Sequence, residues 1–96
     1  TLVVGTHTHV PTNDGRVLSK GTAYLTDAGM CGDYNSVIGM NAENSINRFY
    51  KRDSTKHFPA AGEASLCGAI IQANPKNGLA SNISQFIFGG QLQKEF

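Results

Sequence analysis

Two histidines one residue apart are the first candidates for chemistry. His7 and His9 follow a short apolar run in the stretch VVGTHTHV, and neutral imidazole is a common ligand of metal ions. In an extended strand, alternate side chains point to the same side, and a rise of ~3.3 Å per residue separates the two Cα atoms by ~6.5–7 Å. The pair then suits either two ions ~3.5–4 Å apart, one per imidazole, or one shared ion.

The same pattern also fits two polar side chains on a surface loop, because H-x-H is short enough to arise by chance. A complete metal site needs at least three protein ligands and an open position. The other candidate side chains lie in no recognisable ligand motif: His57, Asp14, Asp27, Asp33, Glu43, Asp53, Glu63 and Glu95. His57 follows Lys56 and is expected at the surface. Spacing alone therefore predicts half of a site.

Other chemistries have weaker support in the sequence. The nucleophile-elbow pattern G-x-S-x-G and the phosphate-binding pattern G-x-x-x-x-G-K-[ST] are both absent. Cys31 lies near two glycines, but no histidine is close to it in sequence. A cysteine nucleophile is therefore set aside.

The elements around the histidines are predicted to be mainly strands and turns. Residues 1–5 form an apolar run typical of a buried strand, in which Gly5 would let the backbone pass close to a site. The Asp14-Gly15 pair predicts a loop over 11–20, and TAYLT predicts a second strand over 22–26. Three glycines and little periodicity predict a structured loop over 27–39.

A helix and a hairpin are predicted in the second half of the chain. Asn41 is a suitable cap for a helix over 41–52, where one stripe collects Ala42, Ile46, Phe49 and Tyr50. The turn sequence NPKNG separates two β-rich segments, 64–73 and 79–88. The fold class is therefore α/β, with one helix and about four mainly antiparallel strands.

Composition limits the classes of function. The 96 residues form one domain at most and carry a net charge of +1, so no stable nucleic-acid binding is expected. No apolar run approaches 18 residues, so no membrane span is expected. The two cysteines lack metal-type spacing and fit a reducing compartment, which favours a cytoplasmic protein. The first residue is Thr, directly before a predicted core strand, so we expect a C-terminal piece of a longer chain.

Asp14 and four longer segments carry a family resemblance: GTHTHV at 5–10, GTAYLTDAGM at 21–30, SVIGM at 36–40 and GEASLCGAII at 62–71. Together, and in this order, they resemble the C-terminal part of bacterial metallophosphoesterases of the YmdB type, within the calcineurin-like superfamily. The resemblance covers essentially the whole chain, with the N-terminal part of the domain absent.

The resemblance implies a four-layer α/β/β/α sandwich and a two-metal phosphodiesterase, a hydrolase of 2′,3′-cyclic nucleotides. It implies that His7 binds one ion and His9 the other, that the ions are iron or manganese, and that they activate a water. The family's remaining ligands and its proton donor have no counterpart in these 96 residues, so no catalytic residue is assigned. Thr8 and Asp14 are expected to shape the nearby loop, and Asp27 to make a structural hydrogen bond.

Two alternatives remain open at this stage. In one, the fragment is non-catalytic and acts as a weak metal-binding or interaction module. In the other, the protein is a single-ion H-x-H hydrolase of a different superfamily. The expected partners are the missing N-terminal part of the same domain and a small phosphodiester substrate, with a homo-oligomer left open.

Overall fold

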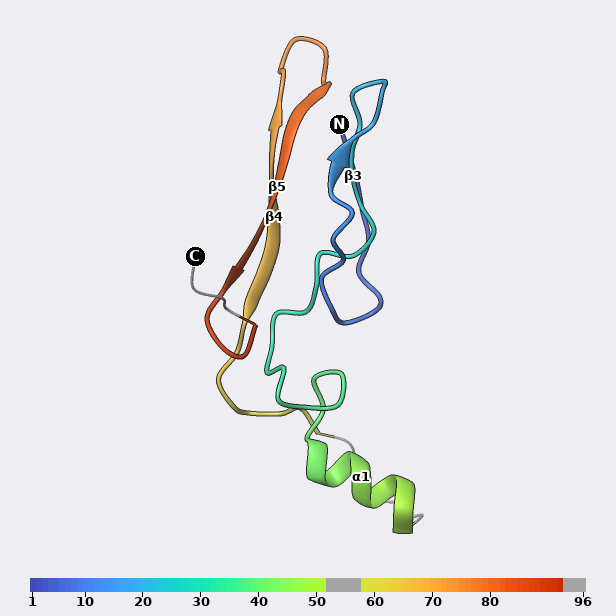
Figure 1. Ribbon diagram of the computed structural model, residues 1–96, viewed down its shortest axis with the longest axis vertical. Helices are drawn as coiled ribbons and strands as arrows, with labels where there is room; N and C mark the ends of the chain where they lie inside the picture. The colour runs from blue at the N-terminus through green and yellow to red at the C-terminus, as the bar shows by residue number, and fades with distance from the viewer. Residues whose placement is uncertain (52–57, 93–96) are drawn as a thin grey trace. The chain divides into compact units, whose positions relative to one another are not determined.

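A computed structural model describes residues 1–51 and 58–92 of the chain, as five strands and one helix (Figure 1). The strands are β1 (Leu2–Val4), β2 (Arg16–Val17), β3 (Ala23–Leu25), β4 (Leu66–Ala73) and β5 (Ala80–Phe88), and the helix is α1 (Ala42–Lys51). The chain divides into two compact units, which are described separately. The first comprises Thr1–Met30 and Cys67–Ile87, and the second comprises Cys31–Leu66 and Phe88–Phe96.

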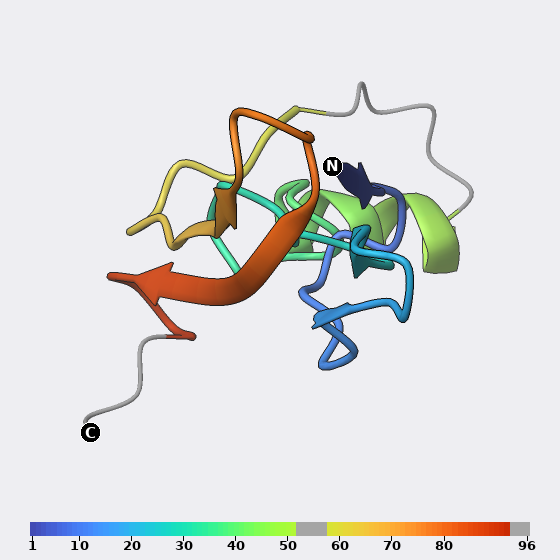
Figure 2. The same ribbon diagram turned by 90° about the horizontal axis from the view of Figure 1, so that it is seen from above.

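A three-stranded sheet in the order β1-β3-β2 forms one half of the first unit (Figure 2). β1 pairs with β3 in parallel, with Val4 opposite Leu25, and β2 pairs with β3 in antiparallel. The β-formers of TAYLT produce this central strand as predicted. Two residues of the predicted loop over 11–20 instead form β2. A short turn closed by a hydrogen bond from the Leu18 amide to the Thr22 carbonyl, 2.8 Å long, brings them beside β3.

The second sheet of this unit is the β4–β5 hairpin. Its turn has the predicted position, and the Asn74 side chain accepts a hydrogen bond from the Lys76 amide at 2.8 Å. Gly78 takes a φ of +72°, which glycine adopts without a steric penalty. The hairpin is joined to the rest of the unit by a hydrogen bond from the Ala80 amide to the Gly21 carbonyl, 2.7 Å long.

Few side chains of the first unit are fully buried. The buried apolar residues among those described are Ala23, Leu25, Cys67 and Ala80. The strand predicted over 1–5 is present as β1. The prediction that it is buried is wrong, because Leu2, Val3 and Val4 are 38%, 55% and 44% exposed. β1 lies at an edge of its sheet and has a neighbour on one side among the described strands, β3.

The second unit contains the helix. Asn41 caps it as predicted, since its side-chain oxygen accepts a hydrogen bond from the Asn44 amide at 2.9 Å. The apolar stripe is not buried within this unit as described, because Ile46 is 51% and Phe49 84% exposed. Paired backbone hydrogen bonds between Gly32 and Ser65 join the two ends of the segment that contains the helix.

The structure confirms a small mixed α/β fold with one helix and two sheets in the described residues. Residues 1–51 and 58–92 form five strands, where about four were expected, and β1 pairs with β3 in parallel whereas β2 pairs with β3 in antiparallel. The four-layer arrangement remains a prediction. The described part of the chain has no helix with the length and hydropathy that a membrane crossing requires.

Candidate metal centre

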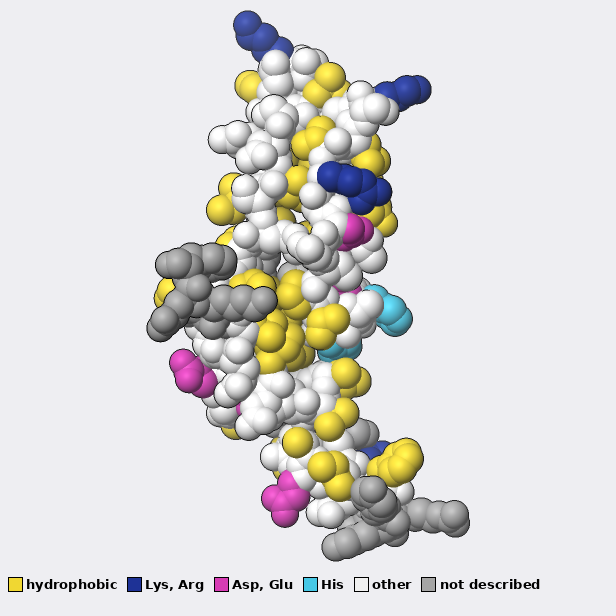
Figure 3. All heavy atoms as spheres, viewed as in Figure 1, with side chains coloured by type: hydrophobic (Ala, Val, Ile, Leu, Met, Phe, Trp, Pro, Cys, Tyr) yellow, Lys and Arg dark blue, Asp and Glu magenta, His cyan; other side chains and the backbone are white. Residues whose placement is uncertain are grey.

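The two candidate ligands lie on the loop that follows β1. The imidazole-bearing residues His7 and His9 are both exposed, and histidine side chains reach the surface of the face drawn in Figure 3. The backbone bends over residues 8–10, and His9 has a φ of +67°. The backbone is therefore not extended through both histidines, so the condition of the alternation argument is not met and that argument does not fix their directions. Left-handed geometry is uncommon outside glycine, although histidine is among the residues that adopt it more often.

A buried carboxylate determines the course of this loop. Asp27 follows β3 and is 1% exposed. Its Oδ2 accepts hydrogen bonds from the His7 amide at 2.7 Å, the Thr8 amide at 2.5 Å and the Thr8 hydroxyl at 2.8 Å. Its Oδ1 accepts the Gly29 amide at 2.9 Å. The structural role expected of Asp27 is confirmed, and this one side chain joins the ends of two neighbouring strands.

These hydrogen bonds also determine the ionisation of Asp27. The Gly29 and Thr8 amides, with smaller contributions from the His7 amide and the Thr8 hydroxyl, hold the pKa of the carboxyl well below its usual range. Burial acts in the opposite direction, because it penalises the charged form, but the donors outweigh it. Asp27 is therefore a carboxylate at neutral pH.

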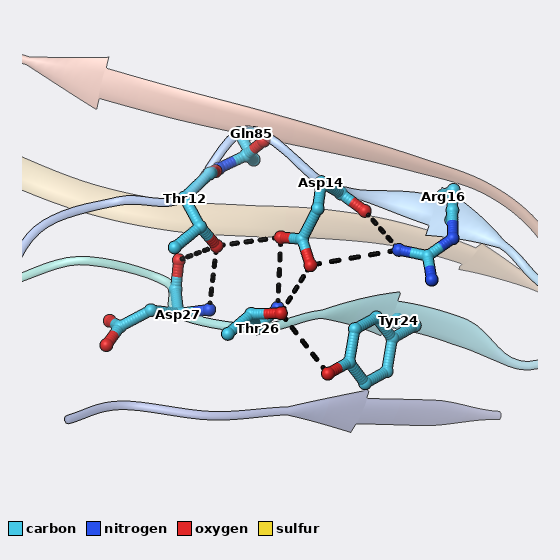
Figure 4. A network of polar contacts seen from close by, with 7 residues as sticks. All are labelled: Thr12, Asp14, Arg16, Tyr24, Thr26, Asp27 and Gln85. Atoms are coloured by element: carbon cyan, nitrogen blue, oxygen red, sulfur yellow. Dashed lines mark hydrogen bonds and ion pairs between the residues drawn. The ribbon is translucent and has the colours of Figure 1, made fainter. Parts of the chain in front are cut away.

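A second carboxylate fixes the loop between the histidines and β2 (Figure 4). Asp14 accepts hydrogen bonds from the Thr26 hydroxyl, from the Thr12 hydroxyl at 2.7 Å and from the Thr26 amide at 3.2 Å. The Thr26 side chain, followed by that of Thr12, lowers the pKa of Asp14 from 3.8 to about 2. The Arg16 guanidinium lies 3.7 Å from Asp14 Oδ2 and 5.0 Å from the centre of the Tyr24 ring. Asp14 therefore shapes this loop, as expected.

Gly5 brings the β1 chain close to β3. Its amide donates to the Leu25 carbonyl at 3.1 Å, and its carbonyl accepts the Ala28 amide at 3.0 Å. A Cβ at this position would collide with the Thr26 carbonyl oxygen. The predicted close backbone approach is confirmed, but the neighbour is β3 and its following residues. These contacts bring the loop after β1 next to Asp27.

The loop and Asp27 surround a hollow of about 240 Å³. Six residues line it: Thr6, His7, His9, Asp27, Gly29 and Met30. Binding pockets for small molecules usually enclose about 300–1,000 Å³, so this hollow is smaller than a complete ligand site. It has two imidazoles on its wall and a charged carboxylate whose oxygens face backbone amides.

The other candidate residues are not gathered at the hollow. Asp33 accepts hydrogen bonds from the amides of Asn35 and Gly62 in the second unit, whereas Glu43 lies in the first turn of α1 and Glu63 is exposed. Three candidates, His57, Asp53 and Glu95, lie outside the described residues. Within residues 1–51 and 58–92, no three His, Cys, Asp or Glu side chains are grouped so as to hold an ion.

The donor set fits a metal centre in part. Imidazole nitrogens suit iron and other first-row transition ions, and His7 and His9 both border the hollow. Asp27 would add negative charge nearby, but its hydrogen bonds occupy its oxygens. The residues present thus fit as two contributors to a larger ligand set.

The sequence did not reveal that the Asp27 carboxylate accepts four hydrogen bonds. It also did not reveal that Thr6, Gly29 and Met30 line the hollow. The hydrogen-bond partners of the Asp27 carboxylate are 19 and 20 residues away, apart from Gly29. No spacing rule connects them. The available signal was a lone Asp directly after a strand, at the end where loops carry function.

Comparison with known proteins relates the chain to one family. A model of the YmdB-like proteins matches residues 1–86. The chain is 42% identical over 85 residues to a 2′,3′-cyclic-nucleotide 2′-phosphodiesterase of Bacillus subtilis, a match that covers 88% of this chain. The same match covers 32% of the relative, so the chain spans about a third of that protein's length.

Two solved structures share this fold. One is a hypothetical protein of Thermus thermophilus, with a TM-score of 0.81 and 37% identity, covering 94% of this chain and 35% of the other. The second is described as a novel phosphatase of Mycoplasma pneumoniae, with a TM-score of 0.84 and 36% identity. That match covers 93% of this chain and 32% of the phosphatase.

Proposed function

Because the chain belongs to the YmdB-like protein family, we propose that it is the C-terminal part of a two-metal phosphodiesterase domain. In this proposal the complete domain is a four-layer α/β/β/α sandwich, and His7 and His9 each bind one of two ions. The other ligands come from the N-terminal part of the same domain. The observation that carries the proposal is that both imidazole-bearing residues border one hollow at the end of β1.

The incompleteness of the described site supports this division. Two imidazoles alone do not provide the three or more protein ligands of a catalytic ion, and the hollow is smaller than a usual binding pocket. A further wall and further ligands from another segment account for both observations. The share of the relatives that the chain matches, 32% to 35%, leaves room for such a segment in a protein of their length.

The residues of this chain bind and orient rather than transfer protons. Iron or manganese, when bound, supplies an activated water for attack on phosphorus. His7 and His9 hold the ions at a fixed place relative to the strand ends. Asp27 has its oxygens occupied by amide and hydroxyl donors, so it does not act as a general acid or base. The proton donor belongs to the other part of the domain.

The substrate class that we propose is the 2′,3′-cyclic nucleotides. This rests on the name of the Bacillus subtilis relative and on the two-ion geometry that the family implies. A cyclic phosphodiester places one phosphorus and two non-bridging oxygens within reach of two ions. His7 and His9, which both border the hollow, would hold those ions.

Hydrolysis of a 2′,3′-cyclic nucleotide by the full-length protein tests the proposal. By full-length we mean the complete product of the reading frame that encodes this chain. We expect His7→Ala and His9→Ala each to lower kcat/KM by more than the ~10–100-fold that follows loss of an outer partner of a metal ligand. His57→Ala is the matched control and is expected to retain activity. Normal turnover in both His7→Ala and His9→Ala would refute the proposal.

The alternative function is a non-catalytic one, in which the chain is a weak metal-binding or interaction module. It is favoured by the absence of any three-ligand cluster in residues 1–51 and 58–92. It predicts that the reading frame upstream of Thr1 encodes no further ligands. Reading that stretch of the gene for an Asp, a Glu and an Asn-His pair therefore separates the two functions.

A further inference from the structure

We propose that Asp27 is a positioning residue for the metal centre: it clamps the backbone of His7 and Thr8 so that both histidines face the hollow. The inference rests on the proposed function and deepens it, since it names the group that orients the two ligands. It concerns a residue that supplies no bond to the metal ions.

The geometry of the clamp is specific to the histidine loop. Asp27 Oδ2 accepts the amides of His7 and Thr8 at 2.7 and 2.5 Å. Two consecutive amides directed at one oxygen fix the peptide planes on both sides of His7. The direction of the His7 Cα–Cβ bond is then set by the clamp, and rotation about χ1 and χ2 remains for the imidazole.

Thr8 extends the clamp to the second histidine. Its hydroxyl donates to Asp27 Oδ2 at 2.8 Å and also lies 2.9 Å from the Val10 carbonyl oxygen. The Val10 amide donates to the same hydroxyl at 3.3 Å. His9, which lies between Thr8 and Val10, is thereby enclosed in a short turn and held at a φ of +67°. Its unusual backbone conformation follows from these contacts.

The oxygen of Asp27 that holds the histidine loop is fully engaged by hydrogen-bond donors. A carboxylate oxygen offers about two acceptor positions, and Oδ2 receives three donors, whereas Oδ1 receives the Gly29 amide. Asp27 is 1% exposed. An ion at Oδ2 would displace the donors of His7 and Thr8 that hold the loop, so the role that we infer for this oxygen is to place the neighbouring ligands.

Binding of Co²⁺ to the full-length protein tests this inference, with the dissociation constant and the visible absorption spectrum of bound Co²⁺ as readouts. Asp27→Asn keeps the shape of the side chain but presents an NH₂ group to N–H donors. We expect it to raise the dissociation constant by ~10–100-fold, the usual effect of losing an outer partner of a metal ligand, and to change the spectrum. The spectrum reports ligand geometry, which a purely structural role would leave unaltered.

Asp33→Asn is the matched control. Asp33 is also buried and also accepts two backbone amides, from Asn35 at 2.8 Å and Gly62 at 3.0 Å, but it does not line the hollow. We expect its dissociation constant and Co²⁺ spectrum to match those of the unmodified protein. An equal change in Asp33→Asn and Asp27→Asn would overturn the inference.

Substitution of Thr8 keeps the inference testable if Asp27→Asn does not fold. Thr8→Val removes the hydroxyl and should weaken Co²⁺ binding and alter the spectrum, whereas Thr8→Ser retains the hydroxyl and should restore both. Identical Co²⁺ binding in Thr8→Val and Thr8→Ser would overturn the inference. His7→Ala separates this failure from that of the proposed function: if His7→Ala binds Co²⁺ normally, the metal centre itself is wrong.

Discussion

Replacement of Gly29 by alanine should destabilise the fold through crowding next to the hollow. Gly29 has a φ of +93°, and a Cβ there would lie 3.0 Å from both Cys67 Cβ and the Pro11 backbone nitrogen and 3.1 Å from Pro11 Cβ. Left-handed backbone in an L-residue costs about 1–2 kcal/mol, and overpacking adds about 1–3 kcal/mol. We therefore expect Gly29→Ala to lower the free energy of unfolding by ~2–5 kcal/mol.

Gly78 offers a matched control for the backbone part of this effect. It has a φ of +72°, but the nearest atom to an added Cβ is Thr1 Oγ1 at 3.5 Å, an ordinary contact. Gly78→Ala should therefore lose the ~1–2 kcal/mol of the backbone term alone. Urea unfolding of both variants of the full-length protein gives the difference, which should be ~1–3 kcal/mol. If Gly29→Ala is no less stable than Gly78→Ala, the packing around Gly29 is not as described.

Two further predictions concern acid and self-association. The pKa of Asp14 is lowered from 3.8 to about 2, so the stabilising effect of this carboxylate is present above pH ~4 and is lost as the pH falls towards 2. The urea midpoint of Asp14→Asn should therefore fall less steeply over this pH range than that of the unmodified protein. An equal dependence of the two midpoints on pH would contradict the stabilising role of the Asp14 carboxylate. The 96-residue chain produced alone should aggregate or remain partly unfolded. The reason is that β1 is an apolar edge strand and that large apolar side chains are exposed on several elements (Figure 3). A monomer in light scattering that also unfolds in one cooperative thermal transition in calorimetry would contradict this prediction.

Local signals in the sequence predicted the local structure. The helix follows from the cap at Asn41 and the apolar stripe after it, and both are encoded within about ten residues. The hairpin follows from NPKNG between two β-rich segments. TAYLT contains the central strand β3. In each case the residues that determine the element lie within it or beside it.

Features that depend on distant partners could not be predicted in this way. The course of the loop before β2 depends on Asp14, which accepts hydrogen bonds from Thr26, 12 residues away. The turn at His9 depends on Thr8 and on Asp27, which comes from the end of another strand. The alternation of side chains along a strand requires extended backbone through both histidines. The contacts of Thr8 and Asp27 bend the backbone there instead. The family resemblance, and not the spacing, supplied the assignment of one ion to each histidine.

The proposed two-metal centre is best examined by counting the metal ions bound per full-length chain. Elemental analysis of the purified protein should give two ions per chain, with fewer in His7→Ala and in His9→Ala and two retained in His57→Ala. A single ion per chain together with normal turnover would favour a single-ion hydrolase. Two ions retained in both His7→Ala and His9→Ala would show that neither histidine is a ligand and would contradict the account.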